Sequence, residues 1–359
     1  MNNFHYTPLG KIPRAKLHRY VALIVCVFVI LSLLYFNSKE TSELPTLIRD
    51  EKTFAHVRRI QFTNPQADLF TKHSEQSLLL CVLVKDEHSY GKGRNFSDMV
   101  KLTVDSLPNP GMVKLAMLIT SQAEYENTNS AISTMESLPF AQIELYRPLD
   151  YLHKQLILDN PRDKRHDSRF QLPRRRMMAS LRNTLMYSAL EPRYSYVLWI
   201  DTDIVSIPQN LASTAIQSGR DIVVPSCYKG DSYYDWNTFI GERTTPNDNE
   251  VVPDLQGNIP EGKTLYVPRH VGGQAWALAD SRFQGSDYVE LTSVGGTWLL
   301  MSTEVILAGV NFGTFNVIGN TWHNEGYDGI ETESVCFMAN RIGKKCWGMP
   351  NVRIYHKND

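Results

Sequence analysis

The sequence predicts an α/β domain in which a mostly parallel central sheet is flanked by helices. Two observations support this prediction. Short apolar runs of strand length, such as Leu78–Val84 and Tyr196–Ile200, have the composition of strands that are buried on both faces. Helical segments separate these runs, and strands that alternate with helices form parallel sheets covered on both sides. The composition, 42% hydrophobic and 21% charged, is that of an ordinary globular protein.

The expected elements follow one another along residues 77–359. A helix at Ser97–Leu107 ends at Pro108, and a helix at Arg175–Leu190 stops before Pro192, because proline disfavours helical conformation in the residue before it. Between residues 226 and 296, abundant glycine and aromatic residues predict long loops with short strands. The other expected strands are Lys114–Thr120, Gln142–Tyr146, Ile222–Pro225, Thr297–Ser302 and Val352–Tyr355, and the other helices are Gln122–Ser137, Leu211–Ser218, Thr303–Ala308 and Glu331–Ile342.

The uncharged run Tyr20–Phe36 predicts a transmembrane helix. Its length is just sufficient, since a spanning helix needs roughly 17–25 apolar residues. A cleaved signal peptide would end in small residues, whereas this run ends in leucine, tyrosine and phenylalanine. Four basic residues and no acid precede the run, so the positive-inside rule places residues 1–19 in the cytosol. We therefore expect a type II membrane protein whose remaining chain faces the secretory lumen.

Residues 37–76 are polar and lack periodicity, and we expect them to form a stem before a single domain at residues 77–359. The whole chain has 37 Lys and Arg against 38 Asp and Glu, but four of the basic residues lie in the expected tail. The lumenal body is therefore acidic overall. That charge argues against a nucleic-acid partner bound by phosphate neutralisation.

Four cysteines lie in the expected lumenal part, at positions 81, 227, 336 and 346, and they allow three different pairings into two disulfides. Cys81 lies in an apolar run and also fits a buried thiol. Asn95-Phe96-Ser97 matches the N-glycosylation sequon, a short pattern that often occurs by chance.

Asp201-Thr202-Asp203 directly follows the strongest strand pattern of the chain, Tyr196–Ile200. Two carboxylates at such a turn can converge on one divalent cation, whose open positions accept diphosphate oxygens. Open parallel sheets bind ligands beyond the carboxyl ends of their strands, where this pair is expected. A plain acidic turn is the usual alternative for so short a motif.

Basic residues begin the helix that precedes this strand. Arg175 and Arg182 are seven positions apart and so share one helical face, with Arg176 and Asn183 beside them. Guanidinium groups bind phosphates in a bidentate manner, which makes this group a candidate for binding a diphosphate. A solvated charged face is the alternative for some of these arginines.

The remaining candidates lie toward the C-terminus. Asp328 and Glu331 belong to a segment of acids, aromatics and glycines at residues 322–333, a composition that suits carbohydrate binding. The same acids also suit the first turn of a helix, where negative charge is favourable. His356 follows the last expected strand, and imidazole is a good ligand for Mn²⁺ in a carboxylate site, although a lone histidine is more often structural.

Three ordered motifs resemble the fungal ANP/MNN/VAN family of Golgi mannosyltransferases, which are subunits of cis-Golgi mannan polymerase complexes. The motifs are RRRMMA followed by Arg-Asn at residues 174–183, WIDTDI at 199–204 and HNEGYDGIETE at 323–333. The resemblance covers about residues 77–359 and implies the GT-A fold of nucleotide-sugar transferases. It also implies residence in the cis-Golgi membrane and a hetero-oligomer with related mannosyltransferase subunits.

The resemblance further implies GDP-mannose as donor, Mn²⁺ as metal and a mannose-terminated mannan or N-glycan as acceptor. The implied metal ligands are Asp201, Asp203 and His356. The implied region for the nucleotide base and ribose is Lys85-Asp86.

The chemistry of transfer stays open. GDP-mannose is α-linked, so an α-linked product means net retention, by a carboxylate nucleophile or by same-face attack assisted by the leaving phosphate. Asp328 and Glu331, which match the acidic loop near the donor sugar, are the candidate nucleophiles. The linkage, α-1,6 or α-1,2, is not determined by the sequence. A non-catalytic scaffold subunit and a transferase for another sugar nucleotide are the alternatives.

Overall fold

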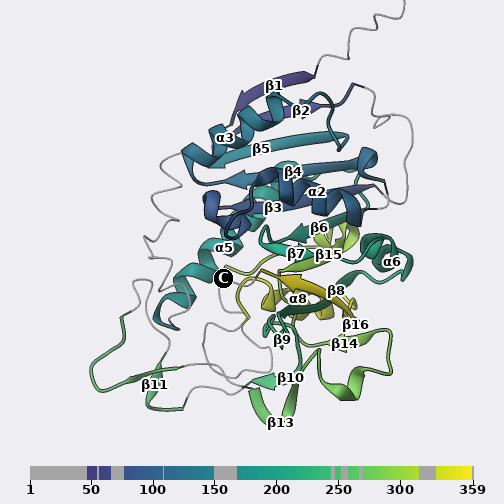
Figure 1. The fold of residues 1–359 in the computed structure, drawn as a ribbon. Coiled ribbons are helices and arrows are strands. Elements are labelled where there is room, and N and C mark those ends of the chain that lie inside the picture. The colour runs from purple at the N-terminus through teal and green to yellow at the C-terminus, as the bar shows by residue number, and fades with distance from the viewer. Residues whose placement is uncertain are drawn as a thin grey trace, which may run out of the picture. The chain divides into compact units, whose positions relative to one another are not determined.

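A twelve-stranded sheet forms the centre of the computed structural model (Figure 1). The structure describes residues 47–54, 56–65, 77–107, 109–148, 168–243, 247–251, 258–266, 270–314 and 329–357. In sheet order, the strands are β1 (Ile48–Thr53), β2 (Val57–Thr63), β5 (Gln142–Pro148), β4 (Val113–Ile119), β3 (Leu78–Val84), β6 (Tyr196–Ile200), β15 (Trp298–Ser302), β8 (Ile222–Lys229), β16 (Cys346–His356) and β14 (Val289–Leu291); β7 (Ile204–Ser206) pairs with β16 and β9 (Ser232–Tyr233) pairs with β8.

The sheet is mixed, which corrects the expectation of a mostly parallel sheet. The neighbouring strands β5, β4, β3 and β6 are parallel, and so are β8 and β16. However, β15 runs antiparallel between β6 and β8, and β2 is antiparallel to β5. A long segment, residues 230–297, connects β8 to β15. A helical crossover between neighbouring strands makes them parallel, whereas a connection of this kind allows the antiparallel direction.

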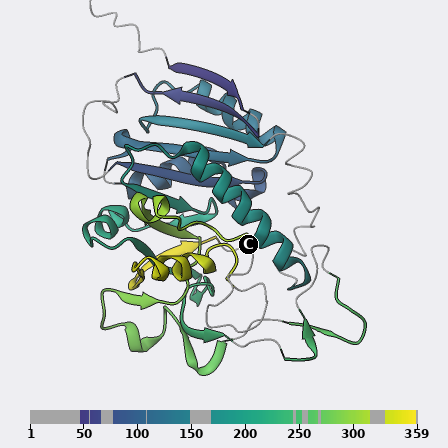
Figure 2. The ribbon, with the colours of Figure 1, turned by 180° about the vertical axis from the view of Figure 1, so that it is seen from behind.

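Both faces of the parallel block are buried. Leu78, Leu80 and Val82 of β3 pack with α2 (Phe96–Ser106) and α3 (Gln122–Ser133), whereas Leu79 and Cys81 pack with α5 (Ser168–Ala189). Successive side chains of a strand point to opposite faces, so an unbroken apolar strand needs cover on both sides. Figure 2 shows α5 crossing the second face of the sheet. The first core also includes α6 (Leu211–Gln217), and the second includes α7 (Thr303–Leu307) and α8 (Glu333–Arg341).

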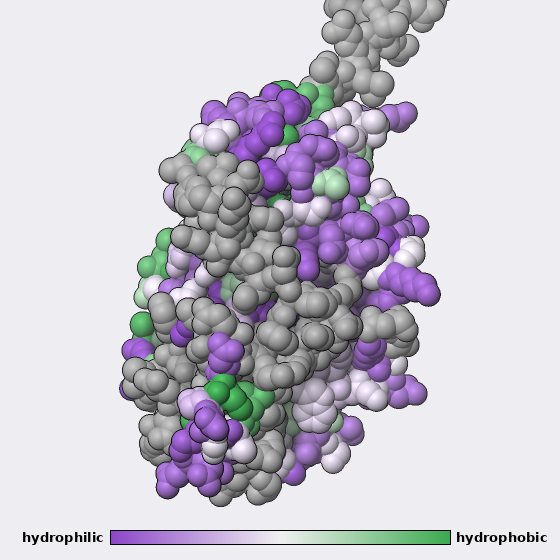
Figure 3. Space-filling model, turned by 90° about the vertical axis from the view of Figure 1, so that its left-hand side faces the viewer, coloured by the Kyte–Doolittle hydropathy of each residue, from purple (hydrophilic) through white to green (hydrophobic). Residues whose placement is uncertain are grey.

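The segment that connects β8 to β15 contains short strands, as predicted. Two small sheets lie there, an antiparallel one of β10 (Phe239–Arg243) with β13 (His270–Ala277) and a parallel one of β11 (Glu250–Val251) with β12 (Thr264–Leu265). The 3₁₀ turns are η1 (Glu87–Tyr90), η2 (Pro110–Met112) and η4 (Ser281–Phe283). The described residues that face the viewer in Figure 3 are mostly hydrophilic, with apolar residues in small groups.

Two strands lie within the segment expected to be an irregular stem. β1 and β2 extend the main sheet, and Val57, Ile60 and Phe62 of β2 are buried. The expectation for residues 37–76 is therefore wrong at these strands. Arg59 lies on the same face of β2 as Val57, and its guanidinium pairs with Glu144 of β5 at 3.4 Å.

The expected tail at residues 1–19 and the expected membrane helix Tyr20–Phe36 lie outside the described residues. Within the described ranges, no helix is long and apolar enough to cross a membrane.

Candidate active site

The Asp201-Thr202-Asp203 turn lies between β6 and β7. The Asp201 N–H donates to the Thr297 carbonyl at 3.0 Å, just before β15. The buried Thr202 hydroxyl donates to the Ser89 carbonyl at 2.5 Å, in the η1 turn that follows β3. The turn is thus tied to the segments on both sides of β6, with an acid on each side of a buried threonine.

His356 is brought to Asp203 by strand pairing. β16 runs antiparallel to β7, and their register places His356 opposite Ile204. The His356 Nε2 atom lies 2.9 Å from Asp203 Oδ2, and its Nδ1 atom lies 3.0 Å from the Lys357 carbonyl oxygen. A carbonyl oxygen only accepts, so Nδ1 is the donor in that bond and Nε2 faces the carboxylate.

A neutral His356 would therefore place two acceptors face to face, so a proton or a cation belongs between Nε2 and Asp203. Burial opposes protonation of the ring, but the hydrogen bond and charge of Asp203 outweigh it and raise the pKa of His356. A backbone carbonyl that fixes the tautomer through the distal nitrogen is the usual support of a metal-binding histidine.

The buried side chain of Arg182 contacts Asp201. The guanidinium is buried and lies with Nη2 3.5 Å from Asp201 Oδ1 and Nε 3.1 Å from Glu331 Oε1. It also lies over the rings of Trp199 and Phe312. Desolvation by the surrounding protein raises the pKa of Asp201, although 38% of its side chain is exposed. The positive charge of Arg182 lowers this pKa, and the negative charge of Asp203 raises it further.

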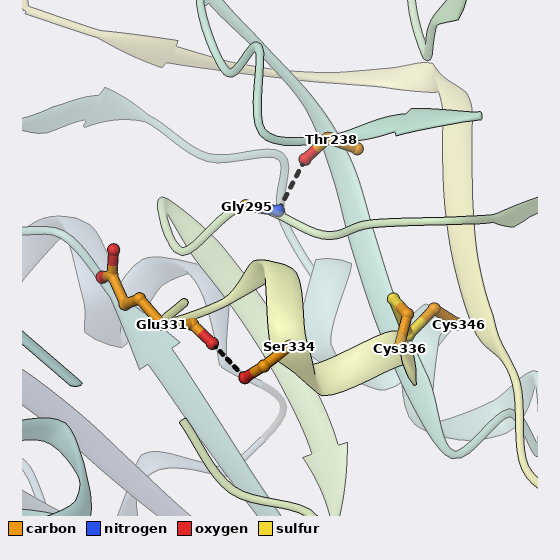
Figure 4. The surroundings of a disulfide bond; sticks show 6 residues. All are labelled: Thr238, Gly295, Glu331, Ser334, Cys336 and Cys346. Carbon is orange, nitrogen blue, oxygen red and sulfur yellow. Dashed lines mark hydrogen bonds between the residues drawn. A yellow bond between two sulfur atoms is a disulfide. The ribbon is translucent and has the colours of Figure 1, made fainter. Parts of the chain in front are cut away.

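Glu331 links Arg182 to Arg175. Its Oε2 lies 3.8 Å from Arg175 Nε, and Arg175 Nη2 lies 3.2 Å from Glu333 and donates to the Ile330 carbonyl at 2.9 Å. Glu331 has a φ of 60°, a conformation that non-glycine residues adopt rarely and that functional sites often retain. Its carbonyl accepts from Ser334 at 2.7 Å (Figure 4). Buried charges thus alternate from α5 to the Asp201 turn.

This arrangement changes the interpretation of the basic helix. Arg175 and Arg182 are buried and contact protein acids, which favours a positioning role over direct contact with a diphosphate. Asn183 uses both ends of its amide on the backbone of Phe312, at 2.7 and 3.0 Å, so it fastens α5 to that segment. Arg176 is half-buried on the same helix.

Lys85 and Asp86 lie at the same edge of the sheet as the Asp201 turn, because β3 and β6 are parallel neighbours. Lys85 is exposed, and its carbonyl accepts from the Ser121 N–H at 2.9 Å. The Asp86 side chain caps η1 by accepting from the His88 N–H at 3.1 Å. Asp328 lies outside the described residues.

A pocket of about 590 Å³ adjoins Asp203. After β3 the chain adds β4 and β5 on one side of that strand, and then adds β6 on its other side. The strand order therefore reverses between β3 and β6, and open α/β sheets bind ligands at such a point. The pocket is mainly basic, and its lining consists of Glu87, His88, Gly91, Lys92, Gly93, Arg94, Asp203 and Lys357.

The residues that shape this pocket were not predicted from the sequence. Arg94 donates to the carbonyls of Thr202 at 3.3 Å and Ile204 at 2.7 Å, and so joins the loop after β3 to the Asp201 turn. The Lys357 N–H donates to the Asp203 carbonyl at 2.9 Å, and its ammonium group donates to the Lys92 carbonyl. Glycines at 91 and 93 in this loop were the available signal, since both have positive φ.

One of the possible cysteine pairings is present among the described residues. Cys336 of α8 forms a disulfide with Cys346 at the start of β16 (Figure 4). It fixes the helix that follows Glu331 to the strand that ends at His356. Cys81 and Cys227 are buried free thiols, and burial raises the pKa of both. The prediction of a buried Cys81 is confirmed.

The donor set of Asp201, Asp203 and His356 has the chemistry of a site for a divalent cation such as Mn²⁺. Within the described ranges, no three His, Cys, Asp or Glu side chains already have the geometry of a metal cluster. The fit of a metal rests on Nε2 of a neutral His356 and the Asp203 carboxylate, which face one another at 2.9 Å and are both acceptors.

Comparison with known proteins assigns the family. The Anp1 family model matches residues 56–316, nearly three quarters of the chain. The chain belongs to the Anp1 family. The match begins at β2, which agrees with the strand pairing that places β2 in the domain.

Among its curated relatives, the Anp1-family chain is 29% identical over 206 residues to the "Mannan polymerase complex subunit mnn9" of Schizosaccharomyces pombe, covering 55% of this chain and 56% of that protein. It is 27% identical to the "Mannan polymerase complex subunit MNN9" of Candida albicans, over 66% of this chain and 62% of that protein. It is 26% identical to the "Mannan polymerase II complex ANP1 subunit" of Saccharomyces cerevisiae, over 73% and 49%. The chain spans about half the length of the curated relatives it matches.

A solved structure, "Mannosyltransferase PcManGT from Pyrobaculum calidifontis in complex with GDP-Man and Mn2+", superposes with a TM-score of 0.41 and 12% identity. The superposition covers 94% of this chain and 67% of that one. It is too loose to assign the GT-A fold.

Proposed function

We propose that this protein is a GT-A-type α-mannosyltransferase that uses GDP-mannose and Mn²⁺ to extend a mannan or N-glycan acceptor. The observation that carries the proposal is the Asp203–His356 pair at the edge of a basic pocket. Metal-binding side chains beside a basic pocket suit a diphosphate, which needs both cations and hydrogen-bond donors. The mannan polymerase names of the relatives support mannose as the sugar.

The residues of the chain have distinct parts in this reaction. Asp201, Asp203 and His356 would hold the metal, with the Lys357 carbonyl keeping Nε2 of the histidine directed at it. Arg182 keeps Asp201 in place, and Lys92 and Lys357 line the pocket proposed for the diphosphate. When bound, Mn²⁺ neutralises charge on the departing diphosphate. Asp328 and Glu331 remain candidates near the donor sugar, and net retention is expected.

We also propose that the protein is a type II membrane protein of the cis-Golgi, anchored by residues 20–36, with its active site in the lumen. The Cys336–Cys346 disulfide supports an oxidising compartment. We propose that it assembles with related mannosyltransferase subunits, as the printed names of its relatives suggest.

The test is transfer by the purified full-length protein from GDP-mannose to mannobiose, with and without Mn²⁺. We expect Mn²⁺-dependent product, and a loss of about 100-fold or more in Asp203→Asn and His356→Ala. The control variant is Asp248→Ala, which should retain wild-type activity because Asp248 is exposed. Full activity in the first two variants would contradict the metal assignment.

The second candidate is a non-catalytic scaffold subunit, which the naming of relatives as complex subunits favours. Product that forms only when a related subunit is added, and that is unaffected by His356→Ala, would support the scaffold. Thermal shift with a panel of sugar nucleotides tests the donor, since a bound donor raises stability by mass action.

A further inference from the structure

Three consecutive residues after β9 face three different environments. The Tyr234 ring lies on the His356 ring, with centroids 4.2 Å apart and planes tilted by 33°. Asp235 is buried, with Oδ2 2.9 Å from the Thr297 hydroxyl. Trp236 is 57% exposed, which is unusual for so large an apolar side chain.

The backbone of this segment is firmly held. Tyr234 N–H donates to the Cys227 carbonyl at 2.8 Å, and Thr238 N–H donates to the Asp235 carbonyl at 3.0 Å. A side chain at Gly295 would overlap the Asp235 carboxylate, since its Cβ would lie 1.7 Å from Oδ2. The Thr238 hydroxyl accepts from the Gly295 N–H at 2.8 Å (Figure 4).

The segment contacts both the strand start that holds the Asp201 turn and the ring of His356. Thr297, which donates to Asp235, also accepts the Asp201 N–H through its carbonyl. Tyr234 covers the ring of His356, at the end of β16. Trp236 therefore projects from a support whose position is fixed by the same residues that fix the metal ligands. The Trp236 ring also meets Tyr233 edge-on, with centroids 5.7 Å apart.

The sheet order separates the start of the Trp236 segment from the loop after β3 that supplies most of the pocket lining. β6 and β15 lie between β3 and β8, and Trp236 follows β8 and β9 whereas the pocket loop follows β3. Trp236 is not part of the pocket lining. A ligand stacked on the indole would therefore lie outside the pocket proposed for the diphosphate.

We propose that Trp236 is the stacking platform for a pyranose ring of the acceptor glycan. This inference rests on the proposed function, since it assigns the acceptor side of the same site. An indole offers a large, rigid, amphipathic surface at low entropic cost, and the apolar face of a sugar ring complements it. A nucleobase is the alternative occupant of an aromatic face, and it would come from the donor nucleotide.

The experiment measures acceptor binding apart from catalysis, by saturation-transfer NMR of mannobiose with the full-length protein. We expect transfer signals from the sugar ring with wild type, their loss in Trp236→Ala, and their retention in Trp236→Phe. Tyr187→Ala is the matched control, because Tyr187 is an aromatic of α5 with 53% exposure. That variant should bind mannobiose like wild type.

Kinetics then separate acceptor from donor. In Trp236→Ala, the KM for mannobiose should rise about tenfold or more, while the KM for GDP-mannose stays unchanged. Wild-type mannobiose signals in Trp236→Ala, or a rise in the donor KM alone, would overturn the proposal. Mannobiose binding that depends on Trp236 in a protein without transferase activity would support the platform and count against the proposed function.

Discussion

The buried Arg182–Glu331 ion pair should stabilise the region around Asp201 more than a surface pair does. The two side chains are 4% and 11% exposed, and Arg182 Nε lies 3.1 Å from Glu331 Oε1. Removing one partner leaves the other charge buried with only a longer contact, to Asp201 at 3.5 Å for Arg182 or to Arg175 at 3.8 Å for Glu331, which costs about 3 kcal/mol of unfolding free energy. We expect a loss of that size in Arg182→Met and in Glu331→Gln.

The double variant should lose less than the sum of the single losses, by about 1–3 kcal/mol, because neither Arg182 nor Glu331 then remains as a buried charge that has lost the other. Urea denaturation of the full chain, followed by circular dichroism, measures all four corners of this cycle. Lys345 and Glu290 provide the matched control, since this pair lies 2.6 Å apart with 52% and 46% of the side chains exposed. Its coupling should stay below about 1 kcal/mol. Additive losses at Arg182 and Glu331, or losses no larger than those of the control, would refute the reasoning.

Three further predictions concern the frame of the site. Replacing Cys336 and Cys346 by alanine should cost about 3 kcal/mol, given their separation of 10 residues, and an unchanged melting temperature would contradict this. Gly295→Ala should cost about 3 kcal/mol or more because its methyl group would overlap Asp235, whereas Gly285→Ala, with nothing within 4 Å, should be nearly neutral in the same melting experiment. Burial raises the pKa of Asp235 despite opposing hydrogen bonds from Thr297 and Asn237. Its contribution to stability should therefore be largest below the ordinary aspartate pKa near 4 and be lost as pH rises through the higher folded value. Asp235→Asn should flatten that part of the stability profile, and an unaltered profile would exclude Asp235 as its source.

The parallel block was predictable from the sequence because its strands are apolar on both faces. β3 agrees with the predicted Leu78–Val84 run, and the Asp201 turn follows β6 as expected. The direction of β15 was not predictable, since periodicity reports burial and not orientation. The start of β16 was not predicted because Gly348 and Pro350 are unfavourable in strands, and the register with β8 shifts between Met349 and Arg353.

The roles of the arginines depended on partners far away in the sequence. Helical spacing placed Arg175 and Arg182 on one face, but not which groups they would meet. Their partners are Glu331, just before α8, and Glu333, its first residue, and both come well over a hundred residues later. The role of Tyr234 and Asp235 likewise depends on His356 and Thr297, which only the sheet order brings near.

Calorimetry of GDP binding to the full-length protein, with and without Mn²⁺, tests the central claim most directly. If Asp201, Asp203 and His356 hold a metal for the diphosphate, Mn²⁺ should tighten GDP binding about tenfold or more in wild type and have little effect in His356→Ala. GDP affinity that is the same with and without Mn²⁺, or a Mn²⁺ effect that persists in His356→Ala, would contradict the account.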